Sequence, residues 1–308
     1  MIYNKIKIGV IGLGYLGKFH YQKYKANRHA SLVAVVDTND ENINKLESNK
    51  VIKTNDYREL IDIVDAVSIV TPTTTHYKLA KFFLENKIHV LLEKPMTETV
   101  GQAKTLNAIA KKNNCVLQIG HLEQFNPAIR KLKLDSVEPQ FIEVHRLCKF
   151  NPRANDVDVV LDLMIHDIDI VLSLVNGKIK KLSVSGKKII TKLTDIANVR
   201  IEFNNNVVAN LTASRISTKN ERKMRIFSKN SYYSIDFIDS ELKKLIKKKN
   251  NTFKTYAHKF AKSDALNDEI KNFINTCRGI ESSMTTGECG ESALKVAKKI
   301  TRALRKND

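Results

Sequence analysis

The sequence predicts a two-domain α/β protein. Residues 1–121 are expected to form a doubly wound parallel sheet, and residues 122–308 an α+β domain with an open, mostly antiparallel sheet. Three observations support this prediction. Short apolar runs alternate with helical patterns up to residue 120, a glycine-rich turn follows the first run, and closely spaced strand patterns dominate afterwards. Alternating strands and helices are typical of parallel sheets, whereas consecutive strands are typical of antiparallel sheets.

The first domain is predicted from five apolar runs and the helices between them. The runs occupy residues 6–11, 31–36, 66–70, 88–92 and 116–119, and helical patterns cover residues 76–85 and 99–112. Parallel sheets of this kind bind ligands at the carboxyl ends of their strands. We therefore expect a binding edge to be formed by the loops that follow three of the runs, at residues 12–17, 71–76 and 93–96.

The turn after the first run has the pattern Gly-x-Gly-x-x-Gly, at Gly12, Gly14 and Gly17. The first glycine permits a tight turn, the second lets the backbone approach a pyrophosphate, and the third lets the helix pack close to the strand. The free N–H groups of the helix then favour the pyrophosphate. Asp37 ends the second run, twenty residues after Gly17. Its carboxylate can accept hydrogen bonds from ribose hydroxyls and would repel a 2′-phosphate, so the sequence predicts NAD rather than NADP.

The second domain is predicted from helices and strands in mixed order. A strand at residues 140–149 precedes a strongly apolar helix at 157–174, and two helices close the chain at 265–278 and 288–306. Strand patterns occupy residues 179–186, 196–203, 207–214, 223–227 and 232–237. Three consecutive asparagines at 204–206 favour a hairpin turn between two of them.

Composition argues against several classes of partner. No apolar run reaches the roughly 18 residues of a membrane span. The four cysteines are scattered without a Cys-x-x-Cys pair, which favours reduced thiols in the cytoplasm over disulfides or a metal. The net charge of +19 comes from 40 Lys and 12 Arg spread along the chain, with no nucleic-acid-reading motif. We interpret the densest run, residues 243–249, as a solvated strand or loop face.

Two polar clusters are candidates for chemistry. Lys94, in Glu93-Lys94-Pro95, follows a buried run and is expected at the carboxyl edge of the sheet, where an amine can hold a substrate hydroxyl and help to take its proton. Asp162 and His166 are four residues apart and share a helix face, so the carboxylate can orient an imidazole for acid–base work. Considered alone, each cluster is also compatible with a structural role.

Taken together, residues 12–17, Asp37, Glu93-Lys94-Pro95, Asp162 and His166 resemble the Gfo/Idh/MocA oxidoreductases over essentially the whole chain. The resemblance implies a Rossmann domain before an open α/β domain, with Lys94, Asp162 and His166 as active-site residues. One departure is Met164, where many members have glycine. Relatives pair the faces of their open sheets, which implies a homodimer or homotetramer with residues 207–214 or their neighbours near the contact.

A narrower resemblance rests on residues 68–77, 120–127, 156–169 and 221–227. These stretches are similar to a bacterial subgroup, the UDP-N-acetylglucosamine 3-dehydrogenases that act before lipid A acylation. The resemblance implies that NAD takes hydride from the sugar C3, and that a PLP aminotransferase converts the resulting ketone to an amine. Two alternatives remain open: a dehydrogenase of another sugar or an inositol-type polyol, and a non-catalytic NAD-binding regulator.

The expected site residues follow from these patterns. Contacts to NAD are expected from the three loops and from Asp37, at Gly12, Gly14, Tyr15, Leu16, Gly17, Asp37, Thr71, Pro72, His76, Glu93 and Lys94. Arginine binds phosphate in a bidentate manner, so the nucleotide sugar is expected to contact polar residues of the second domain: Asn126, Arg146, Arg153, Asp162, His166 and Arg215. Both Lys94 and His166 are candidates for the base.

Overall fold

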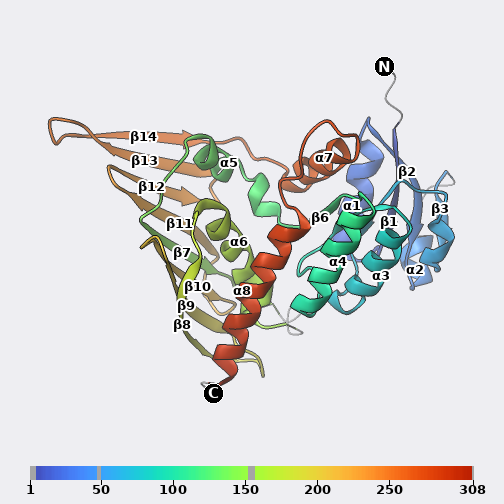
Figure 1. Ribbon diagram of the computed structural model, residues 1–308, viewed down its shortest axis with the longest axis horizontal. Coiled ribbons are helices and arrows are strands. Elements are labelled where there is room, and N and C mark those ends of the chain that lie inside the picture. The colour runs from blue at the N-terminus through green and yellow to red at the C-terminus, as the bar shows by residue number, and fades with distance from the viewer. Residues whose placement is uncertain (1–4, 47–49, 152–156, 307–308) are drawn as a thin grey trace. The chain divides into compact units, whose positions relative to one another are not determined.

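The computed structural model describes residues 5–46, 50–151 and 157–306, and the chain divides into two compact units (Figure 1). The first unit comprises Met1–Phe125 with Asp264–Glu291, and the second comprises Asn126–Ser263 with Ser292–Asp308. Sequence analysis assigned residues 264–291 to the second domain. The structure groups them with the first unit, because helix α7 (Ala265–Cys277) contributes apolar side chains to its core. The predicted division of functions at residue 121 stays a prediction.

The first unit is built on a parallel six-stranded sheet with the order β3-β2-β1-β4-β5-β6. The strands are β1 (Ile6–Ile11), β2 (Ala30–Val36), β3 (Ile52–Thr54), β4 (Ala66–Ile69), β5 (His89–Leu92) and β6 (Leu117–Ile119). Strand β3 is short and largely exposed and was not predicted. The order of strands reverses between β1 and β4, which is the switch point at which such sheets bind ligands.

Helices alternate with the strands of this sheet along the chain, as in a doubly wound fold. They are α1 (Tyr15–Ala26), α2 (Asp40–Asn44), α3 (Thr73–Glu85) and α4 (Val100–Lys112), with short 3₁₀ turns at Tyr57–Leu60 and Leu122–Phe125. Helix α4 begins at a capping box, in which the Thr99 hydroxyl accepts the N–H of Gln102 and the Gln102 side chain accepts the N–H of Thr99. All four residues of β4 are buried, as expected for a sheet covered on both faces.

The second unit is built on an eight-stranded sheet with the order β14-β13-β12-β11-β7-β10-β9-β8. Its strands are β7 (Phe141–Leu147), β8 (Ile179–Lys187), β9 (Ile196–Phe203), β10 (Val208–Ser214), β11 (Glu221–Ser228), β12 (Ser231–Asp236), β13 (Glu241–Lys247) and β14 (Phe253–Lys259). Strands β7 and β10 run parallel, and the other neighbours are antiparallel. The predicted fold class, including the mostly antiparallel sheet, is confirmed.

One face of the eight-stranded sheet is covered and the other is open. Helices α5 (Pro127–Leu134) and α6 (Ile165–Leu174) lie along the covered face (Figure 1). Helix α8 (Gly287–Lys306) reaches the same unit, where Leu304 contacts Gly186 of β8. The edge strands are β8 and β14, so β10 lies inside the sheet and not at an edge. Within the described residues, no helix is long and apolar enough to cross a membrane.

Candidate active site

The glycine turn between β1 and α1 leaves space for a ligand backbone. Gly12 has φ +89°, and a Cβ there would lie 2.5 Å from the Val70 carbonyl oxygen. A Cβ on Gly17 would lie 1.9 Å from the Gly12 carbonyl oxygen, whereas one on Gly14 would meet no atom within 4 Å. Gly12 and Gly17 therefore build the turn, and Gly14 keeps the helix N-terminus open. This cradle fits the pyrophosphate of a dinucleotide.

Asp37 follows β2 and is bonded to the same turn. Its Oδ2 accepts the N–H of Leu13 at 2.6 Å and lies 3.3 Å from the side-chain nitrogen of Asn42, and its Oδ1 accepts the N–H of Asn39 at 2.8 Å. The structure thus brings the predicted carboxylate against the glycine turn. A half-buried carboxylate in this position fits the adenosine ribose of a dinucleotide.

The loops after β4 and β5 are joined by a buried histidine. His76 is 1% exposed, with Nε2 2.9 Å from the Thr71 carbonyl oxygen and Nδ1 2.9 Å from the Pro95 carbonyl oxygen. Burial lowers the pKa of His76, although both carbonyl contacts oppose this shift. The ring holds Thr71 and the residue after Lys94 together. We therefore interpret His76 as support for the loops rather than as a direct contact to the cofactor.

The remaining predicted cofactor residues line the same edge of the first unit. Tyr15 is 80% exposed at the start of α1, and Leu16 beside it is half-buried. Pro72 precedes α3 and is exposed, while Glu93 is buried and Lys94 is half-buried just after β5. All of them follow the carboxyl ends of β1, β4 or β5, which are adjacent strands.

In the second unit, Asp162 and His166 lie on consecutive helical segments. Residues Val160–Met164 form a π-helical turn, and α6 continues from Ile165. Sequence analysis predicted a single helix here. The wider turn still leaves Asp162 and His166 on one side, because four residues span slightly more than one α-helical turn and slightly less than one π-helical turn. Both side chains are half-buried in an otherwise apolar segment, and π-turns occur frequently at functional sites.

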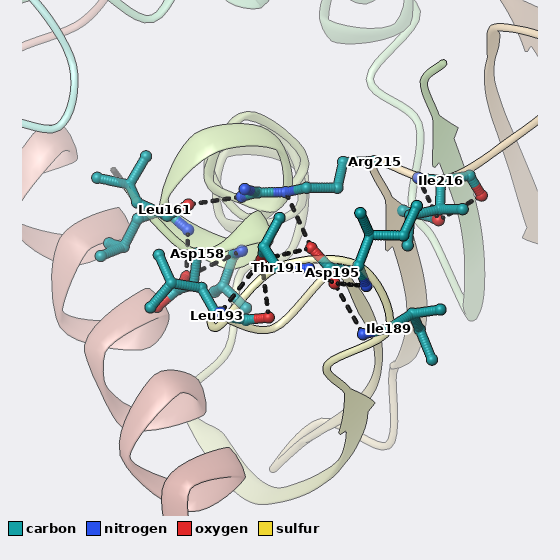
Figure 2. Close-up of polar contacts among 12 residues, drawn as sticks. Asp158, Leu161, Ile189, Thr191, Leu193, Asp195, Arg215 and Ile216 are labelled. Atoms are coloured by element: carbon teal, nitrogen blue, oxygen red, sulfur yellow. Dashed lines mark hydrogen bonds and ion pairs between the residues drawn. The ribbon is translucent and has the colours of Figure 1, made fainter. Parts of the chain in front are cut away.

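The π-helical turn is anchored at its first residues (Figure 2). The Oδ1 of Asp158 accepts the N–H groups of Val160 and Leu161, each at 3.0 Å. The other oxygen of Asp158 accepts a hydrogen bond at 3.1 Å from Thr301 on α8. Asp158 therefore fixes the start of the segment that carries Asp162 and His166.

Arg215, the residue after β10, supports the same segment. Its Nη2 donates to the Val157 carbonyl oxygen at 2.6 Å, and its Nε lies 4.0 Å from Asp195 (Figure 2). Burial alone would raise the pKa of Asp195, but backbone N–H groups of residues 189–191, at 2.7–2.9 Å, and the Thr191 hydroxyl lower it to about 2. Arg215 is only 4% exposed. We therefore leave it out of the proposed substrate contacts.

Arg146 has a similar structural position on β7. Its Nη2 donates to Asp167 Oδ1 at 2.7 Å and its Nε to Asp167 Oδ2 at 2.9 Å, with both side chains at most 3% exposed. A buried guanidinium held by a carboxylate is not placed to bind a diphosphate, so Arg146 is also left out. Asn126 caps α5 by accepting the N–H of Ala128 at 2.9 Å. Arg153 lies outside the described residues.

Sequence reasoning overlooked His20, which contacts Glu93 from α1. His20 lies on the buried face of this helix, together with Gly17, Tyr21 and Tyr24. The sequence does show a histidine on the same helix face as a glycine and two tyrosines, and this pattern could have indicated a buried polar contact. Among the described residues, no group of three or more His, Cys, Asp or Glu side chains could hold a metal ion.

Comparison with known proteins gives the family. Residues 6–121 match the model of the Gfo/Idh/MocA oxidoreductase family with an NAD-binding Rossmann fold, and residues 142–233 match a Gfo/Idh/MocA C-terminal domain. The chain is 35% identical to the UDP-N-acetylglucosamine 3-dehydrogenase of Acidithiobacillus ferrooxidans over 97% of each chain. It is 24% identical to the myo-inositol 2-dehydrogenase of Thermotoga maritima over 94% of this chain and 93% of the relative.

Solved structures agree with this assignment. A structure of the Acidithiobacillus ferrooxidans enzyme matches with a TM-score of 0.92 and 36% identity, over 99% of this chain and 98% of that one. The apo scyllo-inositol dehydrogenase of Lactobacillus casei has the same fold, with a TM-score of 0.83 at 20% identity over 100% and 98% of the two chains. The predicted NAD cofactor and enzyme class are thereby confirmed. The chain belongs to the Gfo/Idh/MocA family of NAD-binding oxidoreductases.

Proposed function

We propose that this enzyme oxidises the 3-hydroxyl of UDP-N-acetylglucosamine to a ketone. The observation that carries the proposal is the 35% identity, over 97% of both chains, to a UDP-N-acetylglucosamine 3-dehydrogenase. The polar groups that such a reaction needs are present: Lys94 after β5, and Asp162 with His166 on the π-helical turn and α6. We further propose that the enzyme acts in the cytoplasm and that a PLP aminotransferase consumes the ketone.

The proposed mechanism divides the work between cofactor and protein. Bound NAD⁺ supplies a hydride acceptor at its nicotinamide C4. His166 or Lys94 would accept the hydroxyl proton as the alcohol becomes a ketone, and the bound dinucleotide would supply the hydride acceptor that balances this oxidation. Asp162 orients the imidazole of His166 and stabilises its charged form. Asp37 and the glycine turn would hold the dinucleotide in place.

The runner-up is oxidation of an inositol-type polyol, which needs no site for a diphosphate. It is favoured by the 24% identity to a myo-inositol 2-dehydrogenase. The role of Arg153 as a diphosphate ligand stays a prediction. The alternative of a non-catalytic regulator does not fit the oxidoreductase class that the comparisons give.

Mass spectrometry of the product tests the proposed function directly. The enzyme is incubated with UDP-N-acetylglucosamine, NAD⁺, a PLP aminotransferase and glutamate, because removal of the ketone draws the oxidation forward. We expect a UDP-sugar in which an amine replaces one hydroxyl, and no such product without NAD⁺. Turnover of inositols but not of the UDP-sugar would favour the runner-up. Turnover of neither would favour a dehydrogenase that acts on another sugar.

Cofactor preference should follow Asp37. We expect NADH to bind at least about tenfold more tightly than NADPH, because the 2′-phosphate would lie against a carboxylate. Asp37→Asn should narrow this ratio and still accept the N–H of Leu13, so the glycine turn is kept. Fluorescence titration of both nucleotides measures the effect. Equal affinities in the wild-type enzyme would refute the argument from Asp37.

We propose that the open face of the eight-stranded sheet forms a homodimer or a homotetramer. A row of aromatic rings crosses this face, with centroids 5.9 Å apart for Phe141 and Phe227 and 5.0 Å apart for Phe227 and Tyr232. Phe227 is 40% exposed, which favours burial against a second copy. Sedimentation at micromolar concentration should detect an oligomer that Phe227→Asp dissociates. A wild-type monomer would contradict this prediction.

A further inference from the structure

The carboxylate of Glu93 is buried directly beside Lys94. Glu93 is 7% exposed, and its Oε2 accepts the N–H of Lys94 at 3.2 Å. The N–H of Glu93 donates at 3.1 Å to the carbonyl oxygen of Ile69, the last residue of β4. The side chain of Glu93 therefore folds back onto the peptide that joins it to Lys94, just after the end of β5. A buried carboxylate is costly unless another group contacts it.

His20 provides that contact from the middle of α1. Its ring is fully buried, with Nε2 3.3 Å from Glu93 Oε1 and Nδ1 2.8 Å from the hydroxyl of Ser68. Ser68 lies on β4 and is also fully buried. The imidazole is thus held by the sheet at one nitrogen and faces the carboxylate with the other. One of the two partners of the ring, Ser68, therefore lies outside the loop that contains Lys94.

Gly120 lies directly against the carboxylate of Glu93. A Cβ at this position would lie 2.8 to 3.0 Å from the two carboxylate oxygens and the carbon between them. Real Cβ contacts are not this short, so any larger residue would displace the carboxylate. The Glu93 carboxylate therefore occupies a defined site, bordered by His20, the Lys94 peptide and Gly120.

The pKa values of Glu93 and Glu269 are shifted in opposite directions. Burial, and then the negative charge of Glu93, raise the pKa of Glu269 on α7 well above its ordinary value. Burial alone would also raise the pKa of Glu93, but the contact with His20 and the charge of Lys94 lower it. These opposite directions favour the neutral form of Glu269 and the ionised form of Glu93.

We propose that His20 is a positioning residue, which fixes the Lys94 peptide by holding the Glu93 carboxylate. His20 is fully buried, so we assign it a role through Glu93 and not a contact with the substrate. It acts through three successive contacts: Ser68 with the imidazole, the imidazole with the Glu93 carboxylate, and this carboxylate with the N–H of Lys94. The last contact fixes the backbone at the residue that carries the proposed catalytic amine. The inference rests on the proposed role of Lys94 in proton transfer.

Two substitutions of His20 separate positioning from general support. In His20→Asn the amide reaches the place of Nδ1 and keeps the contact with Ser68, but it is too short to reach Glu93. In His20→Gln the amide nitrogen reaches the place of Nε2 and can donate to Glu93. We expect hydrogen exchange of the Lys94 amide to become about 10- to 100-fold faster in His20→Asn, and to stay within about threefold of wild type in His20→Gln.

The exchange is measured in protein without substrate, by mass spectrometry with fragmentation that localises deuterium to single residues. With substrate, kcat should fall about tenfold in His20→Asn, with little change in KM, and recover in His20→Gln. Wild-type protein that fails to oxidise UDP-N-acetylglucosamine would refute the proposed function and leave the exchange result intact. Unchanged exchange at Lys94 in His20→Asn would overturn the role of His20.

His89→Asn is the matched control. His89 begins β5, and its Nδ1 accepts the N–H of Val116 at 2.9 Å, a contact that the asparagine oxygen can keep. His89→Asn should leave the hydrogen exchange of the Lys94 amide unchanged. Acceleration at Lys94 as large as in His20→Asn would indicate general loosening of the sheet and overturn the proposal. Equal acceleration in the Asn and Gln variants of His20 would do the same.

Discussion

Replacement of Lys94 or His166 by alanine should lower kcat by about 10²- to 10⁴-fold, the range that general acid–base catalysis contributes. NADH affinity should remain nearly unchanged in both variants, because the glycine turn and Asp37 hold the dinucleotide. The double variant should lose less than the product of the two single losses, since groups that act as a unit are not additive. Steady-state kinetics and NADH titration measure these effects.

Two exposed residues provide the controls for this experiment. Lys112 lies in the last turn of α4, and His258 lies on the exposed strand β14. Alanine at either position removes the same type of side chain and should leave kcat within about twofold, as is usual for surface substitutions. Near-normal turnover in His166→Ala, with sugar and NAD⁺ both saturating, would mean that His166 is a structural histidine of the apolar helix.

The first unit could be predicted in detail because its signals are local. The glycines of the turn, the carboxylate of Asp37 and the strand endings each determine their own surroundings within about thirty residues. The structure confirms the steric need for glycine at 12 and 17, where a Cβ would strike backbone atoms. Helix α7 could not be assigned in this way. Its amphipathic pattern indicates a buried face, but not which of two cores receives it.

The arginines of the second unit show where sequence reasoning stops. A sequence shows that Arg146 and Arg215 are cations near strands, and both were expected to bind a diphosphate. Asp167 lies 21 residues after Arg146 and Asp195 lies 20 residues before Arg215, and no spacing rule connects residues so far apart in the chain. Burial decides the role of such a residue, and burial becomes visible only when the elements have packed.

Strands β13 and β14 illustrate a different difficulty. Lys243, Lys244 and Lys247 lie on β13, and every residue of β14 is exposed. The sequence of such an edge hairpin shows little alternation of apolar and polar residues, because few of its side chains are buried in a core. Charged side chains on edge strands discourage pairing with other chains. The prediction of a solvated strand or loop face for residues 243–249 holds for the exposed Lys243 and Lys247, but Lys244 is 22% exposed and pairs with Asp135. The hairpin was not predicted.

The buried pair of Arg146 and Asp167 should dominate the stability of the second unit. Arg146→Met leaves the Asp167 carboxylate buried without its bidentate partner, which should cost about 3–5 kcal/mol of unfolding free energy. The double variant Arg146→Met with Asp167→Asn should lose clearly less, because the uncompensated buried charge is gone. Urea unfolding followed by circular dichroism measures the differences.

An exposed ion pair on the same sheet provides the comparison. Arg200 and Glu202 on β9 are 3.2 Å apart, but their side chains are 44% and 32% exposed. Arg200→Met should therefore cost no more than about 1 kcal/mol, because water screens the pair and solvates the carboxylate that remains. A loss in Arg146→Met as small as the loss in Arg200→Met would contradict the structural role of the buried pair. Arg146 would then return as a candidate ligand for the diphosphate, and the same variant should raise the KM for the UDP-sugar.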